Sequence, residues 1–271
     1  MTAMEAGTAD PRKTPPVRDD VRAQIASEAT FWGADPFEKP GADTLENLVN
    51  KTQDAAIFFD LVHEFTPLFA GARRIVEVGG GQGWASCLVK RRFPAASVAL
   101  TDAVPEAIAG RGIWERVFAC RLDAAHAAPA QALPFDDASV DLLFCFAAAH
   151  HFVDHDAALR EVGRVLTPRG HCLWLYEPTA PRWLHRAAER RVNRKRVDVP
   201  EHVLKPGDVR AAAARQGLHC EVRYSTSIRH RGRGATLYFT VLGALPVLTR
   251  LLPCTAHFIL TPAGAVSNRG G

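Results

Sequence analysis

Two adjacent histidines, His150 and His151, follow an apolar run typical of a buried β-strand, and Glu177 follows the next such run. Histidine titrates near neutral pH, so its imidazole can take a proton from a bound molecule. A carboxylate beside the ring would orient it and raise its basicity. If the two runs are neighbouring strands of one sheet, these side chains can form a histidine–acid pair, with either histidine as the base.

A glycine-rich segment lies earlier in the chain and reads Glu77-Val78-Gly79-Gly80-Gly81-Gln82-Gly83. Glycines allow a sharp turn and a close approach of ligand to backbone, and the helix expected beyond offers unpaired N–H groups. Dinucleotide-binding dehydrogenases use GxGxxG or GxGxxA. In one register that pattern ends on Trp84, which is too bulky for close packing of the helix on the strand. In the other register it ends on Ser86, which makes the match marginal. The acid before the glycines instead fits E/D-x-G-x-G-x-G.

Further motifs follow in a fixed order along the chain. Asp102 ends a second β-rich run, Leu122-Asp123 ends a third, and the segment LPFDDASVD at 133–141 leads into a fourth. The segment LREVGRVLTPRG at 159–170 comes after the histidines. In this order the motifs resemble those of the class I S-adenosylmethionine (SAM)-dependent methyltransferases, specifically the small-molecule enzymes akin to the ubiquinone/menaquinone methyltransferases. The resemblance covers about residues 73–178.

This resemblance implies SAM as cofactor and a set of residues that bind it. Asp102 would hold the ribose hydroxyls, and Leu122-Asp123 would contact adenine. The alanine-rich stretch after Asp123 is longer than the usual spacer, so the adenine contact stays open between Asp123, Ala124 and a neighbour. The cofactor residues expected are Glu77, Gly79, Gly80, Gly81, Gly83, Asp102, Ala103, Leu122, Asp123 and Phe146.

The same resemblance bears on the histidines. In related sugar O-methyltransferases a tandem histidine at this place contributes to catalysis, which implies His151 or His150 as the base with Glu177 as its partner. Structural alternatives exist for each residue. One histidine could only hydrogen-bond the cofactor or backbone, Asp102 could cap the following helix, and Asp123 could be a turn residue.

The elements that must position these residues alternate between strands and helices. Strands are expected at 73–78, 97–102, 117–122, 140–146 and 171–176, with helices at 84–93, 104–110 and 156–166 between them. This alternation predicts an α/β fold whose parallel sheet is covered on both faces. A helix at 205–216, strands at 218–228 and 256–261, and an apolar segment at 235–252, expected to be a helix kinked at Pro246, follow. The resemblance implies a Rossmann-like, seven-stranded, mostly parallel sheet with an antiparallel last strand.

One catalytic domain with terminal extensions accounts for the chain length. We expect a disordered tail at 1–20, a helical lid at 21–70 with a break at 33–41, and a methyltransferase domain at 71–262. Within this domain, residues 179–204 and 229–253 are expected to be acceptor-side insertions. Residues 263–271 are expected to be a flexible tail.

Composition narrows the classes of partner. The net charge of +4 is mild, and the basic cluster at 182–196 is either a solvated helix face or a contact for an anionic substrate or membrane surface, so nucleic-acid binding is not expected. The six cysteines form no CxxC pair, which predicts no metal site and a cytoplasmic protein. The apolar segment at 235–252 contains Pro246 and Arg250 and is too short to cross a membrane. It could pack on the sheet edge, form a homodimer contact, or line the site of a hydrophobic acceptor; a peripheral membrane contact stays open.

Three functions follow from these features. The first is O- or N-methylation of a small-molecule acceptor, in secondary metabolism or sugar modification. The second is C-methylation of a quinone-like or lipid-linked acceptor. The third is a non-catalytic protein that binds SAM or a nucleotide, which an intact loop and Asp102 would also suit.

Overall fold

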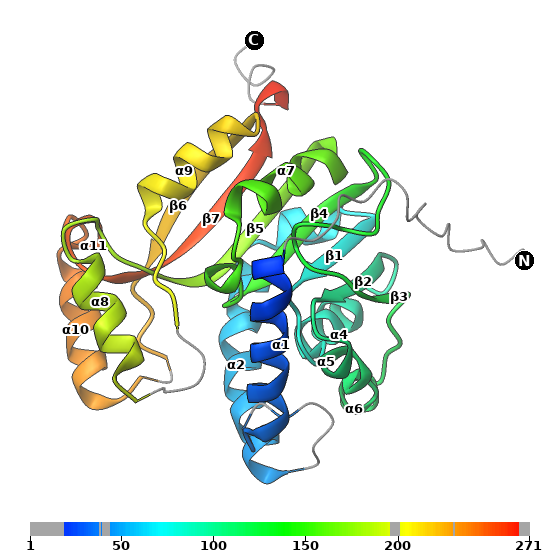
Figure 1. The fold of residues 1–271 in the computed structure, drawn as a ribbon, viewed down its shortest axis with the longest axis horizontal. Coiled ribbons are helices and arrows are strands. Elements are labelled where there is room, and N and C mark those ends of the chain that lie inside the picture. Colours follow the sequence, from blue (N-terminus) through cyan, green and yellow to red (C-terminus); the bar gives the residue numbers. More distant parts are fainter. Residues whose placement is uncertain (1–18, 38, 40–43, 196–200, 230, 266–271) are drawn as a thin grey trace, which may run out of the picture.

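A seven-stranded sheet forms the centre of the computed structural model, which describes residues 19–37, 39, 44–195, 201–229 and 231–265 (Figure 1). The strand order is β3-β2-β1-β4-β5-β7-β6. β1 pairs in parallel with β2 and β4, and β7 is antiparallel to both β5 and β6. The predicted mostly parallel sheet with an antiparallel last strand is therefore confirmed.

The central strands are nearly continuous apolar runs, because helices cover both faces of the sheet. β4, for example, buries five of its seven residues. The strands are β1 (Arg74–Val78), β2 (Ser97–Asp102), β3 (Ala124–Ala127), β4 (Val140–Phe146), β5 (Leu166–Thr179), β6 (Leu218–Ser225) and β7 (Cys254–Pro262).

The helices alternate with the strands through the first two thirds of the chain and then gather at one end. They are α1 (Asp19–Ala34), α2 (Leu45–Glu64), α3 (Thr66–Gly71), α4 (Trp84–Arg92), α5 (Pro105–Ala109), α6 (Arg111–Val117), α7 (His155–Val165), α8 (His185–Val192), α9 (Pro206–Arg215), α10 (Arg233–Ala244) and α11 (Leu248–Leu251). Three 3-10 turns complete the set: η1 (Ala149–His151), η2 (Asn193–Lys195) and η3 (Ala263–Ala265). None of the described helices is both long enough and apolar enough to cross a bilayer.

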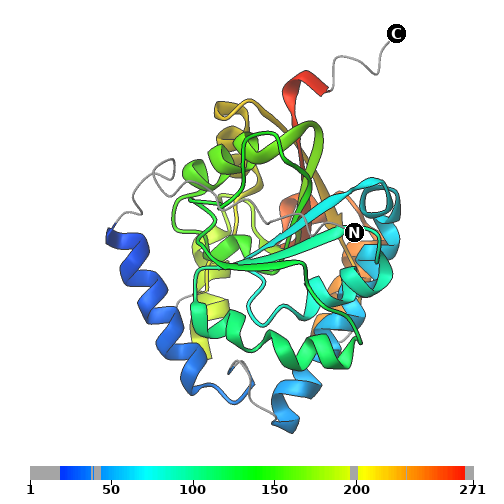
Figure 2. The same ribbon diagram turned by 90° about the vertical axis from the view of Figure 1, so that its right-hand side faces the viewer.

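Each face of the sheet has its own hydrophobic core. On one face α7 and α9 pack through residues such as Leu159, Val162 and Val209. On the other face α2, α3 and α4 pack around Phe58 and Phe69. Figure 2 shows α1, in dark blue, standing apart from α2 on the other side of the view. The two helices of the expected lid therefore do not form one layer.

Three features differ from the sequence predictions. The third strand was expected at 117–122, but that segment follows helix α6, and β3 begins only at Ala124. Strand β5 begins at Leu166, where the preceding helix was expected to end, and not at 171. Pro246 separates two helices, α10 and α11, because proline cannot continue a helix through its missing N–H.

The expected terminal tails fall almost entirely outside the described residues. The described residues exclude 1–18 and 266–271. Of the parts that are described, α1 begins at Asp19 and η3 covers 263–265. The two expected insertions correspond to α8 with η2, and to α10 with α11.

Candidate functional site

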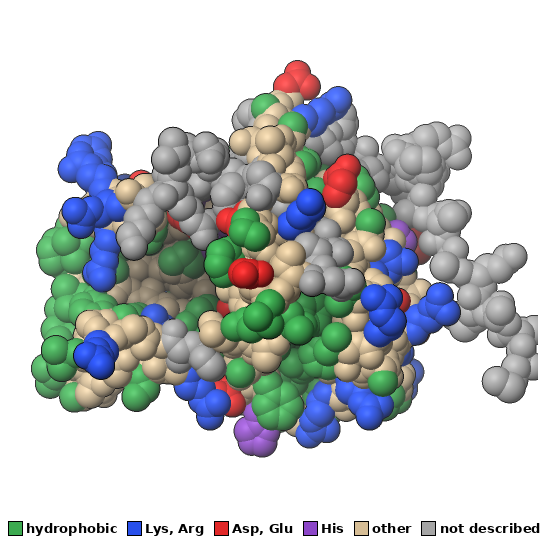
Figure 3. All heavy atoms as spheres, turned by 90° about the horizontal axis from the view of Figure 1, so that it is seen from below, with side chains coloured by type: hydrophobic (Ala, Val, Ile, Leu, Met, Phe, Trp, Pro, Cys, Tyr) green, Lys and Arg blue, Asp and Glu red, His purple; other side chains and the backbone are tan. Residues whose placement is uncertain are grey.

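A cavity of about 610 Å³ lies at the carboxyl ends of the parallel strands. Its walls come from the glycine-rich loop, the ends of β2, β4 and β5, and the outer elements, including Ile25 of α1, Asp54 of α2 and Val192 of α8. Seen from below, the molecule has a hollow between the lobe on the left, which carries α8 and α10, and the central elements (Figure 3). Ligands of open α/β sheets bind at this edge.

The glycines of the loop satisfy two separate constraints. Gly79, Gly81 and Gly83 have φ angles of 67°, 53° and 76°, a region that side chains rarely adopt. At Gly80 the limit is space, because an added Cβ would overlap Leu100 and the carboxyl group of Glu77. Gly79, Gly80 and Gly81 line the cavity, so the backbone is exposed to whatever occupies it.

Glu77 holds the loop against the helix that follows. Its Oε2 accepts hydrogen bonds from the backbone N–H, at 2.8 Å, and from the hydroxyl of Ser86, in the first turn of α4. Burial raises the pKa of Glu77 to about 8. The side chain also borders the cavity, where a cation would favour its ionised form.

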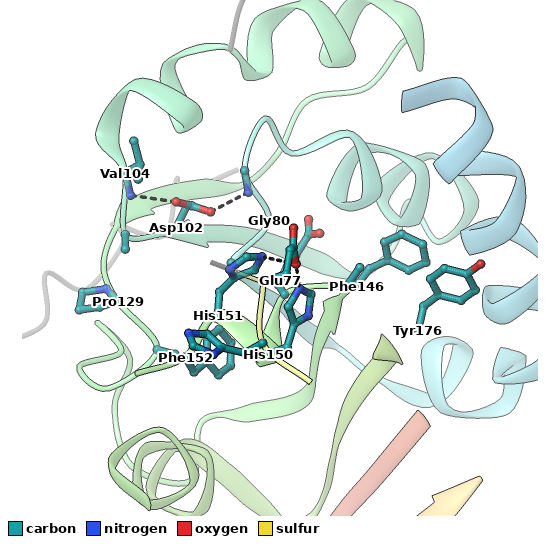
Figure 4. Close-up of a pocket in the computed structure, with 18 of the residues that line it drawn as sticks. Glu77, Gly80, Asp102, Val104, Pro129, Phe146, His150, His151, Phe152 and Tyr176 are labelled. Carbon is teal, nitrogen blue, oxygen red and sulfur yellow. Dashed lines mark hydrogen bonds and ion pairs between the residues drawn. The ribbon is translucent and has the colours of Figure 1, made fainter. Parts of the chain in front are cut away.

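Asp102 ends β2 and directs both carboxylate oxygens at loop backbone (Figure 4). Oδ2 accepts from the N–H of Gly81 and Oδ1 from that of Val104, each at 2.8 Å. Burial raises its pKa. Asp102 and Ala103 both line the cavity, and each carboxylate oxygen has a second lone pair with which to accept from a ligand hydroxyl.

Glu177 anchors the turn that carries the histidines. This carboxylate is completely buried and accepts from the N–H groups of Ala148, Ala149 and His150 at 3.0, 2.9 and 3.1 Å. A bulge in β5 between Trp174 and Glu177, with Tyr176 at φ 62°, breaks the register with β7 just before Glu177. Strained residues of this kind concentrate at functional sites.

His150 lies between two carboxylates. Its Nδ1 is 2.8 Å from Glu177 Oε2, and its Nε2 is 3.0 Å from Glu201 Oε2. Burial by itself would lower the pKa of His150, but the hydrogen bonds to Glu177 and Glu201 outweigh it and raise the pKa to about 9. At neutral pH the ring is therefore a buried imidazolium, with both nitrogens engaged.

His151 is in the opposite electrostatic state. Burial, together with the charge of His150 at a ring-centroid distance of 4.1 Å, lowers its pKa to about 4. Its Nε2 is 3.7 Å from Glu201 Oε2, and the side chain borders the cavity. The structure therefore pairs Glu177 with His150; both histidines line the cavity, and the lowered pKa of His151 favours its neutral form.

Aromatic side chains form the wall next to the glycine loop. Phe146, at the end of β4, stacks on Tyr176 with centroids 5.4 Å apart and an interplanar angle of 8°, and it meets Trp84 edge-on at 5.5 Å. All three line the cavity. Figure 4 shows Phe146 and Tyr176 side by side, beyond Glu77 and His150.

The structure does not bring Leu122 and Asp123 to the cavity. Leu122 is buried in the core under α4, and Asp123 Oδ2 accepts from the N–H of Val98 and pairs with Lys90 at 2.8 Å. Both residues precede β3, so they lie at the amino edge of the sheet and not at its carboxyl edge. The residues that line the cavity after β3 are Ala128, Pro129, Ala130 and Gln131, which the sequence did not single out.

Glu201 is a second residue that sequence reasoning missed. It lies 51 residues from His150, at the end of the expected acceptor-side insertion, and only the fold brings the two together. Ligand atoms of His150, His151 and Glu201 lie within 4.8 Å of one another, which would suit a metal ion. In the structure both nitrogens of His150 already contact carboxylates, so the group is arranged as an ion-paired cluster.

Comparison with known proteins identifies a methyltransferase domain within the chain. A model described as a methyltransferase domain matches residues 76–174. The chain is 30% identical over 128 residues to malonyl-[acyl-carrier protein] O-methyltransferase of Halorhodospira halophila, covering 46% of this chain and 41% of that protein. It is 34% identical over 112 residues to demethylmenaquinone methyltransferase of Thermus thermophilus, covering 41% of this chain and 50% of that protein. The chain therefore matches half or less of the length of these relatives.

Solved structures share the fold over most of the chain. Geranyl diphosphate C-methyltransferase from Streptomyces coelicolor A3(2), in complex with Mg²⁺, geranyl diphosphate and S-adenosyl-L-homocysteine, superposes with a TM-score of 0.61 at 12% identity. The match covers 91% of this chain and 100% of that one. Residues 76–174 therefore form a methyltransferase domain, and the glycine loop and the sheet order agree with that match.

Proposed function

We propose that the chain transfers the methyl group of SAM to a hydroxyl oxygen of a small-molecule acceptor, with His151 as general base. The observation that carries the proposal is the division between the two histidines. Both histidines line the cavity, but both ring nitrogens of His150 are held by Glu177 and Glu201. The ring of His151 is more exposed, and its lowered pKa favours the neutral form. A general base must be unprotonated and within reach of the acceptor.

The residues around the loop fit SAM. Glycine at position 80 lets the loop pack on Leu100 and Glu77, and the backbone of Gly79, Gly80 and Gly81 lines the cavity, where the amino-acid part of a ligand could contact it. Asp102 is placed to accept from ribose hydroxyls, and Glu77 borders the loop with a pKa that a cationic ligand would lower. Ala128 to Gln131 form the wall that we assign to the adenine side.

When bound, SAM supplies an electrophilic methyl group, so the protein has to orient the acceptor and remove a proton. A base with a pKa near 4 is weak toward a resting alcohol. It is sufficient once the oxygen–carbon bond is forming, because the oxygen then becomes strongly acidic. His151 would take the proton at that stage, and Glu201, 3.7 Å from its Nε2, would stabilise the resulting imidazolium.

Replacement of His151 by alanine tests this role. We expect kcat to fall about 100-fold or more with a hydroxyl acceptor. The affinity for S-adenosylhomocysteine in calorimetry should change little, because the glycine loop and Asp102 are untouched. His219→Ala, an exposed histidine of β6, is the matched control and should leave kcat unchanged.

The size of the loss separates the candidate reactions. A loss below about tenfold, with turnover of an amine acceptor, would replace O-methylation by N-methylation, because an amine needs less help from a base. Cofactor binding without turnover of hydroxyl, amine or quinone-type acceptors would instead favour a non-catalytic SAM-binding protein.

C-methylation of a quinone-like acceptor is the second candidate. The stacked pair of Phe146 and Tyr176 gives the cavity a flat aromatic wall that suits a planar ring. The demethylmenaquinone methyltransferase of Thermus thermophilus is among the relatives. A product methylated on ring carbon, identified by mass spectrometry and NMR, would decide for this reaction.

A further inference from the structure

A second cavity, of about 390 Å³, lies beyond the end of β5. Pro178 lines the main cavity, whereas Thr179, Ala180 and Pro181 line the second, so the two are adjacent along the chain. Four cationic side chains border the second cavity: Arg182, Lys205, Arg210 and Arg250. No Asp or Glu is among its described lining residues. The volume falls in the range of small-ligand sites.

The positive charge of this second cavity is largely uncompensated. Lys205 pairs with Asp208 at 3.0 Å. Within the described part of the chain, no carboxylate forms an ion pair with Arg182, Arg210 or Arg250. Burial raises the pKa of Tyr224 in the same cavity, while the charges of Arg210 and Arg250 act to lower it, so both guanidinium groups lie near that phenol. Helix α9 also begins here, which adds favourable potential for an anion.

Exposed apolar residues adjoin these cations. Trp183 follows Arg182 and is 68% exposed, and Leu251 follows Arg250 and is 48% exposed. The apolar surface continues along α10 and the turn into α11 through Leu237, Val241, Leu245 and Val247. Apolar side chains gather along the left edge of the molecule, with Lys and Arg side chains above and among them (Figure 3).

The charge around this apolar surface is predominantly positive. α8 and the residues flanking it carry Arg182, Arg186, Arg190, Arg191 and Arg194 against the single acid Glu189. Glu189 is itself 3.5 Å from His185. An apolar patch with a tryptophan and a basic rim complements an anionic bilayer, which attracts basic side chains and accommodates tryptophan at its interface.

We propose that this side of the chain docks on a membrane of anionic phospholipid. The second cavity receives a phosphate headgroup, and the exposed residues of α10 and α11 contact the acyl boundary. The main cavity then opens beside the bilayer surface. The inference does not depend on which acceptor is methylated.

Co-sedimentation of the full chain with vesicles tests the docking. We expect binding to vesicles of equal parts phosphatidylglycerol and phosphatidylcholine, and none to pure phosphatidylcholine. The triple variant Arg182→Gln, Arg210→Gln, Arg250→Gln should bind these vesicles at least about tenfold more weakly than the parent chain. The matched control Arg91→Gln, Arg121→Gln, Arg169→Gln removes the same charge from exposed arginines outside the cavity and should keep most of the binding.

The apolar contact needs its own pair of variants. Leu245→Ser with Val247→Ser should weaken vesicle binding severalfold. Leu45→Ser with Val117→Ser, two residues of α2 and α6 that are also more than half exposed, should not. S-adenosylhomocysteine binding by every variant shows that it is folded. This second readout also separates failure of docking from failure of the proposed methyl transfer.

Three results would overturn the proposal. In the first, inorganic phosphate raises the melting temperature through the three arginines while no vesicle binds, so the ligand is a small phosphate. In the second, Leu245→Ser with Val247→Ser converts a dimer to a monomer with vesicle binding unchanged, so a second copy covers the patch. In the third, the two triple variants bind vesicles equally, so the attraction is only overall charge.

Discussion

At the residue scale, the cofactor loop depends on glycine for two reasons that the sequence motif does not distinguish. Gly79, Gly81 and Gly83 adopt positive φ, so their constraint is conformational. Gly80 has no positive φ, and its constraint is the space taken by Leu100 and Glu77. A substitution at Gly80 therefore tests the packing of the loop on Leu100 and Glu77 without adding the strain of a positive φ.

Gly80→Ala should weaken binding of S-adenosylhomocysteine at least about tenfold, because the loop must shift to relieve the overlap with two buried side chains. Calorimetry on the purified chain measures this. Gly71→Ala, where an added Cβ meets nothing within 4 Å, is the control and should bind like the parent chain. Equal affinities for the two variants would show that the loop does not hold the ligand closely.

At the scale of elements, an aromatic cluster is part of the core that packs α2 on the sheet. Phe58 is completely buried, stacks on Phe144 of β4 at 5.5 Å and meets Trp84 of α4 edge-on at 5.7 Å. This contact ties the helix that borders the main cavity to the strands that carry the site. The next residue, Phe59, is 52% exposed.

Phe58→Ala should lower the free energy of unfolding by about 3–5 kcal/mol, because it leaves a large cavity in a packed core. Phe59→Ala should change it by less than about 0.5 kcal/mol. Urea denaturation followed by tryptophan fluorescence compares the two. A similar small loss for both would mean that α2 is not firmly packed on the sheet.

At the scale of the whole molecule, the buried charges make stability depend on pH. The folded-state pKa of His150 is raised from 6.5 to about 9, so its contribution is fully present below pH 6.5 and is lost as pH rises through 9. Glu77 acts in the same direction, between its ordinary 4.5 and about 8. Glu77 therefore predicts a loss of stability from about pH 4.5 to 8, and His150 predicts one from about pH 6.5 to 9.

His150→Gln isolates the histidine contribution. The variant should be less stable than the parent at pH 6.5, and the difference in free energy of unfolding should shrink by roughly 2 kcal/mol by pH 9.5. Denaturant titrations at a series of pH values measure the difference. A difference that stays constant with pH would mean that His150 is not an imidazolium between Glu177 and Glu201.

Residues that act through backbone position were predictable from the sequence. The glycine loop, the acid at the end of β2 and the histidine pair after β4 follow from local patterns, because glycines, strand ends and turn residues leave signatures within a few positions. The same holds for the sheet and its alternating helices. The third strand was misplaced, because the short run at 117–122 belongs to a helix end and a turn in which only Leu122 is buried.

The division of roles between the histidines was beyond the sequence. The sequence determined that two imidazoles and Glu177 stand at neighbouring strand ends. Only the tertiary structure decided that Glu177 pairs with His150, and that Glu201 closes the cluster from 51 residues away. A local sequence pattern determines on which strand end or turn a residue lies. The pKa of its side chain depends on burial and on charges that the fold brings from distant segments.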